Sequence, residues 1–177
     1  MRKVDVKDVA QAKAYARIDG ALTALLWIAA FAMQMYYPAG SMGGLLAVSS
    51  PLFVGWRLLR FRDEVLGGAI SFRRAYYYSF YTFVCASLVF ALAQYVYFRF
   101  IDGGQFVGIF QSALSAIEEA YKQSNRPTAD IEAMRETVSA LTPVNWAVMI
   151  MVQNISIGVL ASLPIALFCR RKSEQAT

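Results

Sequence analysis

The length of its uncharged segments constrains this chain more than any other feature. No Asp, Glu, Lys or Arg occurs in the 37 residues from Gly20 to Trp56, and Ala75 to Phe98 is uncharged for another 24. One straight helix of that first length would extend about 55 Å at ~1.5 Å per residue, far beyond a ~30 Å hydrocarbon core. The first stretch therefore predicts two membrane-spanning helices joined by a bend, and the second predicts one.

The bend is predicted at residues 36–41, which read Tyr-Tyr-Pro-Ala-Gly-Ser. Tyrosine suits the membrane interface, whereas Pro38 and Gly40 stop a helix. We place the first two spans near residues 18–37 and 42–61. The second span is the weaker one, because it contains Pro51 and several glycines and because Arg57 and Arg60 interrupt its end. Their long side chains would allow these arginines to extend to the headgroups.

Two further spans are predicted at residues 75–98 and 144–169. The fourth span starts behind Thr142 and Pro143, which are favoured as the N-cap and the first residue of a helix. Tyrosines near the ends of the third span suit a headgroup boundary, since the ring is apolar and the hydroxyl is not. These are Tyr76, Tyr77, Tyr78, Tyr95 and Tyr97.

Composition supports a membrane protein, because 58% of the residues are hydrophobic and only 16% are charged. The fold class is therefore an all-α membrane protein, with four transmembrane helices in a single polytopic domain over residues 1–177. The N-terminal segment contains Asp5 and Asp8, and no clear small-x-small cleavage site follows the long apolar run, so we expect the first span to be retained. We expect residues 7–17 to continue its helix into the interface.

The distribution of Lys and Arg predicts the orientation through the positive-inside rule. Thirteen of the seventeen basic residues lie in the N-terminal segment, in the connection between spans 2 and 3, and after span 4, while the connection between spans 3 and 4 has four bases against six acids. Both termini and the connection between spans 2 and 3 are therefore expected on the cytoplasmic side. The thirteen are Arg2, Lys3, Lys7, Lys13, Arg17, Arg57, Arg60, Arg62, Arg73, Arg74, Arg170, Arg171 and Lys172.

The segment 102–142 is the one sizeable polar region, and it predicts an extracytoplasmic amphipathic helical hairpin. Apolar residues recur there at spacings of three and four on both sides of a break at residues 124–128. We expect these faces to pack on each other or on the membrane surface, and to face a partner. The stripe residues are Phe106, Phe110, Leu114, Ile117, Tyr121, Ile131, Met134 and Val138.

Five arginines between spans 2 and 3 are the densest polar group of the chain. Their guanidinium groups could bind an anionic lipid or a lipid-linked phosphate, but orientation alone would also place arginines there. Gly67 and Gly68 in the same connection indicate a simple bend. The arginines are Arg57, Arg60, Arg62, Arg73 and Arg74.

Polar residues inside the spans require partners. Gln153 and Asn154 lie near the middle of the last span, so we expect them to face other helices and hydrogen-bond there. A contact with a substrate is the functional alternative. Asp19 lies near the cytoplasmic mouth of the first span, where either headgroup exposure or pairing with an arginine would satisfy it.

The chain contains no histidine, which removes the commonest general base and the commonest metal ligand. Cys85 and Cys169 lie in apolar runs and form no CxxC pair, so packing accounts for them. Asp63 and Glu64 adjoin arginines and are more simply ion pairs than catalytic groups. We therefore predict no catalytic, cofactor or metal site, and the basic residues beside apolar runs argue against nucleic-acid binding.

Short motifs in this order resemble a family of bacterial membrane proteins known as domain of unknown function 4199. They are Phe61-Arg62-Asp63, then Gly67 to Phe72, then Phe100-Ile101-Asp102 before the external helices. The likeness extends over roughly residues 18–172 and implies a four-helix inner-membrane protein without an assigned activity. Gly103 departs from such proteins, which often have proline after Ile-Asp.

Two functions remain open on this evidence. The first is a non-enzymatic scaffold or accessory subunit, which contacts a membrane-protein partner or a second copy of itself. The second is a small transporter or lipid-handling protein that binds anionic headgroups through the arginine loop. No Asp, Glu, Lys or Arg lies in the central part of any span, which disfavours a proton-driven pump.

Overall fold

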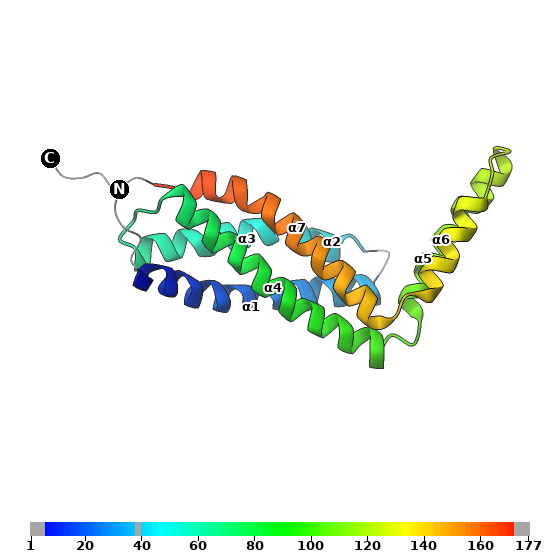
Figure 1. The fold of residues 1–177 in the computed structure, drawn as a ribbon, viewed down its shortest axis with the longest axis horizontal. Helices are drawn as coiled ribbons and strands as arrows, with labels where there is room; N and C mark the ends of the chain where they lie inside the picture. The colour runs from blue at the N-terminus through cyan, green and yellow to red at the C-terminus, as the bar shows by residue number, and fades with distance from the viewer. Residues whose placement is uncertain (1–5, 38–39, 172–177) are drawn as a thin grey trace. The chain divides into compact units, whose positions relative to one another are not determined.

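A computed structural model describes residues 6–37 and 40–171 of the chain, and within them four helices are long and apolar enough to cross a membrane. This confirms the predicted fold class. Pro38 of the predicted bend and the basic residues Arg2, Lys3 and Lys172 lie outside the described residues. The elements are α1 (Val6–Tyr36), α2 (Met42–Val48), α3 (Ser50–Arg60), a π-helical turn η1 (Phe61–Val65), α4 (Phe72–Phe100), α5 (Gln105–Gln123), α6 (Ala129–Ala140) and α7 (Pro143–Cys169) (Figure 1).

The helix ends follow local signals in the sequence. α1 ends at Tyr36 and α2 begins at Met42, so the helix break lies where the aromatic and Gly-containing segment predicts it. α7 begins at Pro143, and the Thr142 hydroxyl oxygen accepts a hydrogen bond from the backbone N–H of Asn145 at 3.3 Å. Thr142 therefore contributes to the helix start as predicted.

The second span consists of three successive helical segments. α2 and α3 are separated at Ser49, two residues before Pro51, and η1 continues the helix to Val65. The span therefore runs four residues beyond the predicted end at Phe61, which places Arg62 in a helix. Gly67 and Gly68 then have φ values of +68° and +90°, which glycine adopts without strain, so they form the expected bend.

The contacts divide the chain into two compact units. The bundle unit comprises residues 1–91 and 150–177, and the hairpin unit comprises residues 92–149.

Close helix packing in the bundle unit depends on glycine. A Cβ added at Gly20 of α1 would lie 2.6 Å from the Cβ of Cys85 in α4, and one at Gly158 of α7 would lie 2.6 Å from the Cβ of Phe83 in α4. A Cβ at Gly43 of α2 would lie 2.7 Å from the Ala30 carbonyl oxygen of α1. Small residues let helices approach closely where no hydrophobic effect drives them together.

Buried hydroxyl groups line the same helix contacts. Each donates a hydrogen bond to a carbonyl oxygen four residues earlier in its own helix, so burial leaves none of these groups unsatisfied. They add small polar surfaces between helices without needing a partner on another helix. They are Thr23, Ser79, Thr82, Ser87 and Ser162.

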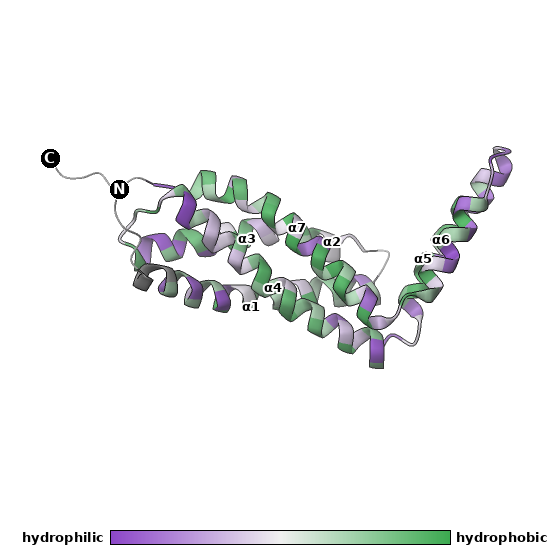
Figure 2. Ribbon diagram, viewed as in Figure 1, coloured by the Kyte–Doolittle hydropathy of each residue, from purple (hydrophilic) through white to green (hydrophobic). Residues whose placement is uncertain are grey.

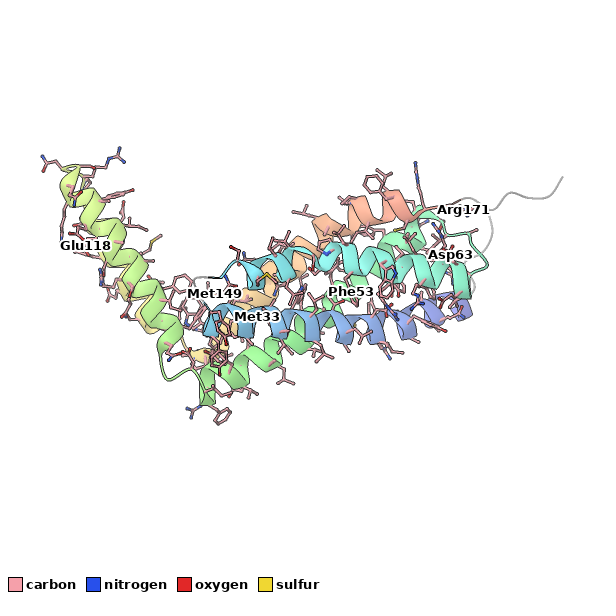
Figure 3. All side chains as sticks on the ribbon, turned by 180° about the vertical axis from the view of Figure 1, so that it is seen from behind. Met33, Phe53, Asp63, Glu118, Met149 and Arg171 are labelled. Carbon is pink, nitrogen blue, oxygen red and sulfur yellow. The ribbon has the colours of Figure 1, made fainter. Side chains whose placement is uncertain are left out.

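Two contacts join the C-terminal end of α7 to the connection between η1 and α4. Ile70 and Arg171 exchange both backbone hydrogen bonds, at 2.9 and 3.0 Å. Arg62 donates from Nη1 to the carbonyl oxygen of Cys169 at 3.0 Å, which satisfies a carbonyl at the helix end. Asp63 and Arg171 accordingly lie at one end of this unit (Figure 3).

In the hairpin unit, Asp102 fixes the start of α5. Its carboxylate accepts hydrogen bonds from the backbone N–H groups of Gly104, at 3.2 Å, and Phe106, at 3.0 Å. Gly103 has a φ of +55°, a value that the ring of proline cannot reach. The turn of this chain therefore requires a residue other than the proline expected from the family resemblance.

Candidate functional site

A buried carboxylate joins three helices of the bundle unit. Asp19 of α1 is 2% exposed at its side chain, and its Oδ1 accepts a hydrogen bond from Arg57 Nε of α3 at 2.6 Å. Arg57 Nη2 lies 2.5 Å from the same oxygen. The hydroxyl of Tyr78 in α4 donates a hydrogen bond to Oδ2. We call Asp19, Arg57 and Tyr78 the buried ionic site.

Aromatic packing holds the donors of this site in place. The ring of Tyr78 stacks on Phe61 with centroids 4.8 Å apart, and Phe61 in turn contacts Tyr15 at 5.1 Å. The Arg57 guanidinium lies 5.7 Å from the centroid of the Trp56 ring. These contacts restrict the rotamers of the donors, so the carboxylate meets them in a fixed geometry.

The buried ionic site joins α1 to α3 and α4. Both oxygens of Asp19 accept hydrogen bonds from side chains on those two other helices. A single buried charge in a bilayer would be costly, and the Arg57 partner offsets that cost. The two readings of Asp19 are thereby resolved: it pairs with an arginine and is not exposed to headgroups.

Two sequence interpretations require correction here. Arg57 does not extend outward to the headgroups, because it turns to Asp19 and its side chain is only 22% exposed. Tyr78 is fully buried and is not a headgroup-facing tyrosine like its neighbours in the sequence. Neither contact was foreseeable, since hydropathy does not identify which residues 38 and 59 positions apart become neighbours.

The five arginines of the connection do not form one open cluster. Arg60 lies 3.3 Å from Glu64 and over the Trp56 ring at 5.0 Å, and Arg62 pairs with Asp63 at 2.7 Å. The acidic residues of this region thus form the expected ion pairs. Arg73 and Arg74 belong to the first turn of α4, where Arg73 is exposed and Arg74 is half-buried.

The sequence predicts that the mid-span amides of α7 face other helices, and neither amide has a hydrogen-bond partner among residues 6–37 and 40–171 of this chain. The side chain of Gln153 is exposed and that of Asn154 is half-buried. Hydropathy cannot distinguish the covered from the uncovered faces of such a helix, because a helix surrounded by lipid is apolar on every face.

The hairpin is helical as predicted, with α5 and α6 lying side by side (Figure 1). Leu114 and Ile131 are buried, while Phe106 and Val138 are half-buried. The remaining members of the predicted stripe are exposed, together with Ile109. These residues, Ile109, Phe110, Ile117, Tyr121 and Met134, are called the exposed hairpin face.

Polar contacts fasten α5 to α6. Arg135 donates to Glu118 Oε2 at 2.7 Å and Lys122 donates to Oε1 at 2.5 Å, and these two cations lower the pKa of the Glu118 carboxyl below its ordinary value. Gln111 and Ser139 are 3.3 Å apart further along the hairpin. The hairpin is therefore held by these polar bonds and by few buried apolar groups, and Figure 3 labels Glu118 on it.

An aromatic cluster packs α4, α5 and α7 together inside the hairpin unit. The ring of Phe106 lies 4.8 Å from Phe98 and 5.0 Å from Trp146, and Phe110 lies 5.1 Å from Trp146. Phe106 and Phe110, which are predicted to face a partner, thus bury part of their surface against other aromatic rings of the hairpin unit. The spacing of apolar residues in the sequence identified Phe106 and Phe110 as members of an apolar stripe. It did not identify the aromatic residues that they contact.

A known protein family matches most of this chain. The family described as a protein of unknown function, DUF4199, matches residues 19–171, which is more than half of the chain. The chain belongs to the DUF4199 family. The match in this DUF4199 protein begins at Asp19 and ends at Arg171, so it includes the buried ionic site, the Ile70–Arg171 bridge and the hairpin. No curated protein and no solved structure matches the chain.

Proposed function

We propose that this DUF4199 protein is a non-enzymatic accessory subunit or scaffold of a complex in the bacterial inner membrane, and that its hairpin contacts the partner protein. The observation that carries the proposal is the exposed hairpin face. Met134 is 59% exposed, Ile109 48% and Ile117 47%, although all three are large apolar side chains. Figure 2 shows such hydrophobic residues along α5 and α6 beside hydrophilic ones.

Charge favours a protein partner over a lipid surface for this face. Residues 105–140 contain five acids and three bases, and two of the bases, Lys122 and Arg135, pair with Glu118. Helices that lie on membranes are usually rich in Lys and Arg, which attract anionic lipids. An acidic rim around apolar side chains instead complements an apolar groove bordered by basic residues.

The partner test replaces two residues of the exposed hairpin face. We expect Ile117→Ser with Met134→Ser to lose a partner that copurifies stoichiometrically with the unaltered protein in mild detergent, because the substitutions remove apolar contact area. Leu52→Ser is the matched control, since Leu52 is 78% exposed on α3. A partner retained by the double variant, or equally lost in the control, would contradict the proposal.

We further propose that the hairpin is extracytoplasmic and both termini are cytoplasmic. The support is the positive-inside distribution of Lys and Arg together with four helices capable of crossing the membrane. A phosphatase reporter inserted at Asn125, in the α5–α6 turn, should be active, and the same reporter at the C-terminus should be inactive. Activity at both positions, or the reverse pattern, would overturn this orientation.

A second candidate function is the binding of anionic phosphate headgroups at the basic end of the bundle unit. One observation favours it: the Ile70–Arg171 bridge brings the segment before Arg73 against the segment that carries Arg170. We expect Arg73→Ala with Arg170→Ala to reduce retained phosphatidylglycerol in native mass spectrometry, relative to Arg126→Ala on the hairpin. Equal retention of phosphatidylglycerol by the unaltered protein, the double variant and Arg126→Ala would contradict this second function.

A further inference from the structure

α7 is the most apolar of the four candidate spans, and it is also the span with the smallest share of residues buried by the rest of the described structure. Only 17% of its most apolar window is buried within the described structure, against 22% to 39% for the other three candidate spans. Exposed residues include Val152, Ile157 and Leu160, which lipid could solvate. Gln153 lies among them, and lipid cannot satisfy its amide.

Gln153 is too deep for its side chain to reach water. It follows the start of α7 at Pro143 by about 15 Å and precedes the end at Cys169 by about 24 Å, at ~1.5 Å per residue. A glutamine side chain spans only a fraction of these distances. In hydrocarbon, an amide without a hydrogen-bond partner is strongly unfavourable, so its partner must come from another helix.

Neighbouring polar groups show how this chain satisfies polar residues where it can. Ser156, one turn further along α7, donates to the Val152 carbonyl oxygen of its own helix at 2.9 Å. The buried hydroxyls of the bundle unit do the same. An amide cannot satisfy all of its donors and acceptors in this way, and Gln153 has no partner on any other described residue.

We propose that α7 forms an interface between two copies of this chain, in which Gln153 of one copy hydrogen-bonds to Gln153 of the other across a two-fold axis. A primary amide carries both donors and an acceptor, so two identical amides satisfy each other without any other chemistry. Ser156 and Leu160 lie three and seven residues after Gln153, which places them on the same face. This face contains no charge that would select a different partner.

The interface is independent of the hairpin proposal. It lies on residues of the bundle unit, whereas the proposed partner contact lies on the exposed hairpin face. The Ile117→Ser and Met134→Ser variant should therefore keep self-association while it loses its partner. Failure of one proposal leaves the other standing.

Cross-linking of the full chain in lipid vesicles tests the geometry. In a background with Cys85→Ala and Cys169→Ala, Leu160→Cys should form a disulfide-linked dimer on mild oxidation. Leu92→Cys on α4 is the matched control, because Leu160 is 67% and Leu92 is 66% exposed. Equal cross-linking of the two variants would overturn the proposal, and so would a disulfide from Leu160→Cys exclusively to a different protein.

The amide itself is tested by substitution. Gln153→Leu should weaken dimerisation by about 3- to 30-fold, measured by energy transfer between labelled copies as the protein is diluted in lipid, and Gln153→Asn should retain most of it. Thermal unfolding of the protein diluted until it is monomeric should be unchanged in both variants, since the side chain is exposed within one copy. An unchanged dissociation constant for Gln153→Leu would refute the pairing.

Discussion

Substituting Asp19 by asparagine is expected to lower the free energy of unfolding by about 3 kcal/mol, because the change leaves the Arg57 guanidinium without a counter-charge. That figure is at the low end of the range for a broken buried pair, since the Arg57 side chain retains 22% of its exposure. Tyr78 would also lose the charged acceptor of its hydroxyl. The effect is measured by chemical unfolding in mixed micelles, followed by circular dichroism.

Two controls separate lost pairing from lost polarity. Asp63→Asn removes a carboxylate, whose side chain is 51% exposed, from Arg62 and should destabilise the protein far less than Asp19→Asn does. Asp19→Leu combined with Arg57→Met removes both charges and should recover most of the stability. If Asp19→Asn were no more destabilising than Asp63→Asn, the buried ionic site would not be what joins α1 to α3 and α4.

Gly158→Ala and Gly20→Ala are each expected to destabilise the bundle unit by about 1–3 kcal/mol. The new Cβ at Gly158 would lie 2.6 Å from Phe83 Cβ and 2.9 Å from Phe83 Cγ, whereas carbon atoms pack at about 3.5–4.0 Å. At Gly20 the nearest atoms are Cys85 Cβ at 2.6 Å and the Thr82 carbonyl oxygen at 2.9 Å. These atoms belong to or adjoin the backbone, so whole helices would have to move apart.

Gly44 provides the matched control for these substitutions. It lies in α2, and a Cβ added there would meet no atom within 4 Å. Gly44→Ala should therefore stabilise the protein by up to about 1 kcal/mol through helix propensity alone. Gly44→Ala and Gly158→Ala should therefore change the free energy of unfolding in opposite directions when both are measured in the same unfolding assay. If Gly158→Ala also stabilised the chain, α7 would not pack closely against α4.

Local sequence features predicted the elements of this fold well, for a physical reason. A membrane helix must satisfy its own backbone and cover a fixed thickness with apolar side chains, so its length and its ends are encoded within a few neighbouring residues. The helix start at Thr142-Pro143 and the amphipathic spacing of 105–140 are signals of this local kind. Gly20 and Gly158 also carried a readable signal, since glycine within an apolar helix often marks close packing.

The candidate site was far less predictable, because it depends on which helix faces meet. Asp19 was recognised as a charge that needs a partner, but Arg57 and Tyr78 became its partners only when α1, α3 and α4 packed together. The arginine cluster was likewise divided by contacts with Glu64, Asp63 and the end of α7. Spacing along the chain contains no information on these encounters.

The uncharged segments by themselves determined that this chain has four helices able to cross a membrane, since no other arrangement hides the backbone of so many apolar residues. Only the tertiary structure decided which faces of those helices contact protein and which remain uncovered. In a bilayer both surroundings are apolar, so hydropathy cannot distinguish them. Gln153, which is expected to face another helix and is exposed within this chain, is the residue where that distinction matters most.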